Sequence, residues 1–135
     1  MESIYFPMSG RILTVGHIKC LEYLNKKGFV YIGLLTAKAL RGYKQEVVPF
    51  KDRQYVLETV AMALGNIDVV PQDSRDPSKN IKYYDCQAIA SGDGFNKWEL
   101  SAIKKYKLKV INIKLSGERE KLYSSSRILK CQKKI

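Results

Sequence analysis

Residues 29–35 read FVYIGLL, a run with no charged side chain. Such a continuous apolar run is typical of a strand buried on both faces, as in the parallel sheets of α/β proteins. A shorter apolar run at 3–8 (SIYFPM) indicates an earlier strand. A helix is expected between them over 17–27, where apolar residues fall near helical spacing, and Gly28 stands where a helix C′ residue belongs.

The rest of the chain continues this alternation of apolar runs and helical segments. Further strands are expected at 67–70, 88–90 and 109–113, and helices at 53–64 and 96–106. Five strands joined by crossover helices predict one α/β domain over residues 1–135. We expect a Rossmann-like three-layer sandwich with a five-stranded parallel sheet.

The segments between the predicted strands and helices contain helix caps and loop residues. Asp52 is interpreted as the N-cap of the helix at 53–64, and Gly65 as its end. Residues 36–51 are expected to form a long loop with a helical turn near 37–41. A polar loop is predicted at 72–79, and a last helix beginning at the serines 124–126.

Composition limits the class of protein. The chain has 135 residues, 45% of them hydrophobic and 27% charged, which fits one ordinary folded domain and excludes intrinsic disorder. No apolar run approaches the ~18 residues of a membrane span. The early Glu2 and the absence of a basic start argue against a signal peptide. Three widely spaced cysteines without a CxxC argue against disulfides and zinc, so a cytoplasmic location is expected.

The positive charge is concentrated near the end of the chain. The net charge is +11, and residues 97–135 carry 12 lysines and arginines against 3 acidic residues. Such a field attracts phosphate, in nucleotides, in nucleic acids or on membrane surfaces. A solvated lysine-rich surface explains the composition equally well.

The segment after the first strand is the first candidate site. Parallel sheets bind ligands at the carboxyl ends of their strands, where the strand order reverses. Thr14 and His17 are three residues apart at the start of a predicted helix, so they face the same side. Gly16 lets a ligand approach the backbone, and a helix N-terminus binds phosphate. The alternative is a histidine that only caps the helix or lies on the surface.

Three further segments could contact phosphate or nucleoside. Lys44 and Arg53 lie in a basic stretch, which could also be a solvated loop. Gly92 and Asp93 follow the fourth strand, where Asp93 can accept hydrogen bonds from a sugar or base; an ordinary turn is the alternative. After the last strand come a basic residue and three hydroxyls that suit an anion or an N-cap, namely Arg119, Ser124, Ser125 and Ser126.

The order of these segments resembles the small nucleotidyltransferases of the cytidylyltransferase-like superfamily, such as glycerol-3-phosphate cytidylyltransferase. That family carries Gly-x-Phe-Asp-x-x-His-x-Gly-His after strand one, and residues 14–17 (TVGH) match its tail with threonine for the first histidine. The family's Gly, Phe and Asp align with Met8, Gly10 and Arg11. Later family motifs align with residues of the other segments, namely Thr36, Leu40, Lys44, Pro49, Arg53, Gly92, Asp93, Gly94, Phe95, Arg119 and residues 123–126.

The resemblance implies a reaction in which a phosphorylated small molecule attacks the α-phosphate of a nucleoside triphosphate and pyrophosphate leaves. It gives His17, Thr14 and Lys44 catalytic roles, with Lys44 and Arg53 also binding the acceptor. It implies nucleotide contacts from residues of all the turns, namely Ser9, Gly10, Gly16, Gly92, Asp93, Arg119, Ser124, Ser125 and Ser126. Mg²⁺ and a homodimer are further implications.

The nucleotide and the activity itself stay open at this point. The middle of the sequence favours CTP, whereas Thr14 and the triple serine favour ATP. An inactive nucleotide-binding protein of the same fold is an alternative, because the Met8–Arg11 turn departs from the family pattern. A nucleic-acid-binding domain is less favoured, since tyrosines accompany the basic residues but no recognised motif does. No membrane partner is expected.

Overall fold

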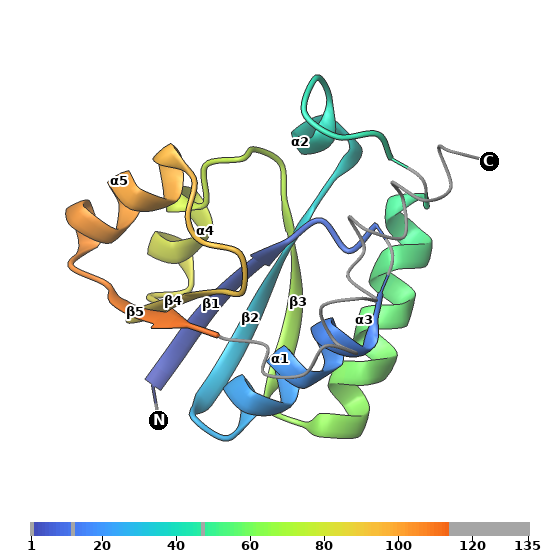
Figure 1. Ribbon diagram of the computed structural model, residues 1–135, viewed down its shortest axis with the longest axis horizontal. Helices are drawn as coiled ribbons and strands as arrows, with labels where there is room; N and C mark the ends of the chain where they lie inside the picture. Colours follow the sequence, from blue (N-terminus) through green and yellow to red (C-terminus); the bar gives the residue numbers. More distant parts are fainter. Residues whose placement is uncertain (1, 12, 47, 114–135) are drawn as a thin grey trace.

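The computed structural model describes residues 2–11, 13–46 and 48–113. They form a five-stranded parallel sheet of order β3-β2-β1-β4-β5, with helices on both faces (Figure 1). The elements in chain order are β1 (Glu2–Met8), α1 (Val15–Asn25), β2 (Gly28–Leu35), α2 (Ala37–Leu40), α3 (Phe50–Leu64), β3 (Ile67–Gln72), α4 (Ser78–Tyr83), β4 (Ala88–Ser91), α5 (Lys97–Tyr106) and β5 (Lys109–Asn112). The predicted α/β three-layer fold is therefore confirmed.

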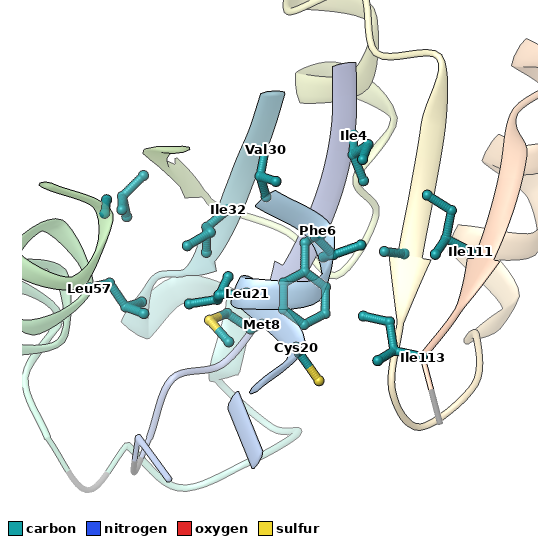
Figure 2. Close-up of a cluster of buried hydrophobic side chains, with 14 of the residues drawn as sticks. Ile4, Phe6, Met8, Cys20, Leu21, Val30, Ile32, Leu57, Ile111 and Ile113 are labelled. Carbon is teal, nitrogen blue, oxygen red and sulfur yellow. The ribbon is translucent and has the colours of Figure 1, made fainter. Parts of the chain in front are cut away.

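Two apolar clusters hold the three layers together. On the α1 and α3 side, Phe6 and Ile32 pack with Leu21 and Leu57 (Figure 2). On the α4 and α5 side the central buried residue is Tyr5. The alternation of strand side chains between two faces explains why neighbours in β1 join different clusters. Burial on both faces is the arrangement that the apolar run of β2 predicted.

The order of the strands reverses beside β1. The chain runs outward from β1 to β2 and β3, then returns to place β4 on the other side of β1. The carboxyl ends of β1 and β4 are therefore neighbours with no crossover helix between them. This is the place where open α/β sheets leave a crevice.

Two boundaries of the first half differ from expectation. Helix α1 ends at Asn25 with Lys26 as its C-cap, so the interpretation of Gly28 as a C′ residue is wrong. Gly28 instead begins β2, where a Cβ atom would overlap the backbone carbonyl of Glu2. Helix α3 begins at Phe50 after Pro49, so Asp52 lies in the first turn and is not the N-cap. A carboxylate is favourable there because the helix dipole is positive at its N-terminus.

The polar segment 72–79 is only partly a loop. Gln72 ends β3, and Ser78 begins the short helix α4, which the sequence did not reveal. Only Ile81 of α4 is buried, so the helix has almost no apolar periodicity to detect. The expected helix at 124–126 lies outside the described residues. No helix of the described part has the length and apolar character needed to cross a bilayer.

Candidate functional site

A cavity of about 550 Å³ opens at the carboxyl ends of β1 and β4. Its walls come from the ends of β1 to β4, the first turn of α1, the loop after α2 and the start of α5. Many residues that the sequence singled out line it together, namely Ser9, Thr14, Gly16, His17, Lys44, Gly92 and Asp93. The cavity thus occupies the position where the reversal of strand order predicts a ligand site.

Thr14 and His17 form the start of α1. The backbone N–H of Thr14 donates to His17 Nδ1 at 3.0 Å, and the Thr14 hydroxyl lies 3.1 Å from the same nitrogen. Because Nδ1 accepts from the backbone, the neutral ring carries its proton on Nε2. His17 therefore caps its helix with one nitrogen and keeps an N–H donor on the other. The capping alternative and the functional alternative are compatible in this geometry.

The pKa of His17 lies below its ordinary value. Burial is the main cause; the negative charge of Asp93 opposes it, and the positive charge of Lys44 adds to it. The ring is therefore neutral at neutral pH, which suits a hydrogen-bond donor held close to other cations. A neutral ring also avoids repulsion with Lys44 before an anion is bound.

The depressed pKa of His17 predicts a pH-dependent stability. Between the folded pKa and the ordinary value of about 6.5 the unfolded chain binds more protons, so stability falls as the pH falls through about 6.5. The variant His17→Gln lacks this group but shares every other titrating residue. Chemical denaturation of both proteins between pH 7.5 and 5.5 should show the larger loss in wild type. Parallel curves would refute the depressed pKa.

Lys44 reaches the cavity from the loop after α2. The Thr36 hydroxyl accepts from Ala39 N at the start of α2, and Lys44 N donates to Leu40 O at 2.9 Å after its end. The Lys44 ammonium lies 5.0 Å from the centre of the Tyr43 ring. Among the described residues it has no ion pair. A phosphate in the cavity would supply the missing negative charge.

The loop after β4 brings backbone and a carboxylate to the opposite wall. The Ser91 hydroxyl accepts from Asp93 N at 3.1 Å and donates to Gly94 O, which closes a tight turn. Gly94 has φ +93°, a conformation that favours glycine. Asp93 is left exposed at the cavity, where it can accept hydrogen bonds from a ligand.

Arg53 is not in the cavity, contrary to its expected role in acceptor binding. Its side chain is buried, and the guanidinium is taken up by protein acceptors. Nε donates to Val48 O at 2.8 Å, Nη1 donates to Ser9 O and Leu35 O at 2.7 and 2.6 Å, and Nη2 pairs with Glu46 at 2.7 Å. These bonds tie the ends of β1 and β2 to the loop that follows α2. We therefore assign Arg53 to the structure that supports the site.

Gly10 also lies outside the cavity wall. It adopts φ +60°, and a Cβ atom there would come within 2.9 Å of Leu34. The residue shapes the turn between β1 and α1 and does not line the cavity. The predicted contacts from Arg119, Ser124, Ser125 and Ser126 lie outside the described residues.

Arg75 also lines the cavity, although no sequence motif singled it out. It follows β3 within the segment interpreted as a polar loop. Its guanidinium lies 3.6 Å from the centre of the Tyr43 ring and 4.6 Å from that of Trp98. A basic residue just beyond the carboxyl end of a strand is a usable signal, but it has no place in the motifs of the resemblance.

The carboxylates that line the site supply few ligands for a metal ion. Within residues 2–11, 13–46 and 48–113 no group of three His, Cys, Asp or Glu side chains could hold one. Glu99 lines the cavity but accepts from Asn96 N at 2.8 Å as part of the α5 cap. Asp93 is the better candidate.

Comparison with known proteins gives relatives in structure alone. No protein-family model matches the chain, and no curated protein sequence is similar to it at a significant level. A lipopolysaccharide core biosynthesis protein from Thermoplasma volcanium is 21% identical with a TM-score of 0.67, over 86% of this chain and 97% of that one. A universal stress protein from Archaeoglobus fulgidus is 14% identical with a TM-score of 0.55, over 84% and 94%.

The Archaeoglobus fulgidus stress protein has also been solved with dAMP. That structure is 15% identical with a TM-score of 0.58, over 84% of this chain and 98% of the other. Similarity at these levels of identity establishes the shared fold. This chain therefore has the Rossmann-like α/β fold that biosynthetic and nucleotide-bound proteins share.

Proposed function

We propose that the protein transfers a nucleotidyl group, with CMP favoured over AMP, from a nucleoside triphosphate to a phosphorylated small molecule and releases pyrophosphate. One observation carries the proposal. The Thr14–His17 turn, Lys44 and Asp93 come from three separate loops and line one cavity at the reversal of strand order. The partial positive charge at the N-terminus of α1 adds to the attraction for phosphate.

In the proposed reaction, an oxygen of the acceptor phosphate attacks the α-phosphorus of the nucleotide. A new P–O bond forms as the bond to the β-phosphate oxygen breaks, and pyrophosphate carries away that electron pair. His17 Nε2–H and the Lys44 ammonium stabilise the charge on the transferred group, and the rigid turn positions it. When bound with the nucleotide, Mg²⁺ supplies further charge neutralisation, and Asp93 is the residue that would contact it.

The structural relatives support the proposal in a general way. The Thermoplasma volcanium protein is described as acting in lipopolysaccharide core biosynthesis, and the stress protein was solved with a nucleotide, dAMP. A biosynthetic transferase that binds a nucleotide is consistent with both. A homodimer stays a prediction from the sequence resemblance.

A thermal-shift titration with CTP and with ATP, each with Mg²⁺, tests nucleotide binding. A ligand at 100 times its dissociation constant stabilises a fold by about 2.7 kcal/mol, a rise in melting temperature of roughly 10 °C for a domain of this size. We expect the larger shift with CTP, followed by pyrophosphate release when a phosphorylated acceptor is added. A larger shift with ATP would indicate that the protein transfers AMP and not CMP. No shift with either nucleotide would refute the proposal.

An inactive nucleotide-binding protein is the second candidate, favoured by the altered turn after β1. Arg11 stands where the resembled family has an acidic residue, and its Nε is buried without a hydrogen-bond partner among the described residues. Nucleotide-induced stabilisation without pyrophosphate release from any phosphorylated acceptor would favour this candidate.

A further inference from the structure

Two aromatic rings contact the guanidinium of Arg75, which lines the cavity. The Tyr43 ring, from the loop after α2, and the Trp98 ring, from α5, lie 3.6 and 4.6 Å from the guanidinium carbon. Contacts with aromatic rings do not use the N–H donors at the edge of this planar group. That edge carries the donor fork that matches a carboxylate or a phosphate.

The edge of Arg75 has no partner among residues 2–11, 13–46 and 48–113. Among the described residues Arg75 forms no ion pair, and its buried Nε has no acceptor. Two acidic groups near Arg75 make hydrogen bonds to other residues, since Asp76 accepts from Ser78 N at 2.9 Å and Glu99 accepts from Asn96 N in the α5 cap. The positive charge of Arg75 acts to lower the pKa of Glu99, but the two side chains form no ion pair. A buried donor on a charged group is costly to leave unpaired, so an acidic ligand is the expected acceptor.

Hydrogen bonds from Gln72 and Asn80 hold the loop that carries Arg75. Gln72 Nε2 donates to Ser74 O at 2.8 Å, and Gln72 itself accepts from the Tyr5 hydroxyl at 2.6 Å. Asn80 Nδ2 donates to the same hydroxyl and to Pro71 O, both at 2.9 Å. This network positions the backbone next to Arg75, and the two rings contact its guanidinium before any ligand arrives.

Arg75 lies near Lys44, because both cations contact the Tyr43 ring. The guanidinium carbon is 3.6 Å and the Lys44 ammonium 5.0 Å from the centre of that ring. Lys44 is the residue that the sequence resemblance assigns to the acceptor as well as to catalysis. A second acidic group on the acceptor would therefore lie close to the Arg75 guanidinium.

We propose that Arg75 binds a second acidic group of the acceptor, a carboxylate or a second phosphate, distinct from the phosphate that receives the nucleotide. The inference rests on the proposed function and narrows its substrate class. The acceptor is a small phosphorylated acid and not a phosphorylated neutral alcohol. Arg75 contributes specificity, and the chemistry of transfer stays with the α1 turn and Lys44.

Three probes with one carbon skeleton test this assignment by calorimetry. Glycerol 3-phosphate has the single phosphate, 3-phosphoglycerate adds a carboxylate, and glycerol 1,3-bisphosphate adds a phosphate. We expect wild-type protein to bind at least one two-acid probe 10- to 100-fold more tightly than glycerol 3-phosphate, the range for hydrogen bonds to charged groups. Whichever two-acid probe binds more tightly shows whether Arg75 prefers a carboxylate or a second phosphate.

Substitution at Arg75 should abolish this preference. In Arg75→Met the affinities for the three probes should become equal, while affinity for CTP or ATP stays at the wild-type value. Arg75→Lys keeps the positive charge but lacks the paired donors of the guanidinium, so the preference for two-acid probes should fall several-fold. This variant tests the inference if Arg75→Met does not fold. The matched control is Arg41→Met, an exposed arginine outside the cavity wall, which should behave as wild type.

Several outcomes would overturn the inference. Equal binding of all three probes by the wild-type protein would refute it. Survival of the preference for two-acid probes in Arg75→Met would also refute it. An equal loss for every probe would indicate a structural role, and a matching loss for the nucleotide would assign Arg75 to the nucleotide. Pyrophosphate release as fast with glycerol 3-phosphate as with both acids would also refute it and leave the transfer reaction intact. A retained preference without any transfer would refute the proposed function instead.

Discussion

His17→Gln is expected to lower the rate of nucleotidyl transfer by about 10²- to 10³-fold with little change in stability. A glutamine at this third position of a helix can accept a hydrogen bond from the backbone of the capping residue, as His17 Nδ1 does from Thr14 N. The substitution therefore keeps the cap and removes the Nε2–H donor. The loss reports on charge stabilisation in the transition state, since the neutral ring donates to the group being transferred.

His17→Ala separates the two functions of the side chain. It removes the cap as well as the donor, so we expect a similar loss of rate together with about 1 kcal/mol of stability. Lys19→Gln is a suitable control, because Lys19 is an exposed cation of the same helix whose 4.0 Å contact with Glu22 contributes little. Initial rates of pyrophosphate release at saturating substrates, with melting curves beside them, measure both effects. A wild-type rate in His17→Gln would remove His17 from the mechanism.

Arg53→Met is expected to destabilise the fold by about 3–5 kcal/mol, the range for breaking a buried, hydrogen-bonded ion pair. The methionine would leave the carbonyls of Ser9, Leu35 and Val48 without their donor and Glu46 without its cation. Arg53→Lys should recover part of this loss, because one ammonium keeps the charge but cannot reach acceptors spread around a planar group.

Urea denaturation of Arg53→Met, Arg53→Lys and wild type measures this effect. Arg41→Met, at an exposed position, should stay within about 0.5 kcal/mol of wild type. The role first expected from the sequence makes the opposite prediction, namely weaker acceptor binding at unchanged stability. Unchanged midpoints in both Arg53 variants would therefore restore Arg53 to the substrate site.

The comparison of these two residues shows what the sequence could and could not predict. His17 and Thr14 are neighbours on one helical turn, so their convergence follows from local spacing. The acceptors of Arg53 at Ser9 and Leu35 are 44 and 18 residues away in the chain. Only the folded sheet reveals that the arginine is already satisfied. A basic residue near phosphate-binding motifs has the same appearance in sequence whether it binds substrate or supports a loop.

For the fold, too, local patterns could be predicted from the sequence, whereas contacts between distant segments could not. The strands were detectable because each carries an apolar run, and β2 carries the longest uncharged one. Helix α4 was missed because a short polar helix with one buried residue has no period to read. Arg75 was missed because its partners come from distant segments, Tyr43 from the loop after α2 and Trp98 from helix α5. Long-range stacking leaves no local pattern in a sequence.

The stack on Arg75 also gives the protein an optical reporter. Trp98 is the single tryptophan of the chain, so all tryptophan fluorescence arises beside Arg75, a residue of the cavity wall. The charged guanidinium beside the indole makes the emission sensitive to any ligand that moves or neutralises it. Occupancy of the cavity can therefore be followed in the unlabelled protein, without a coupled assay and before the physiological substrate is known.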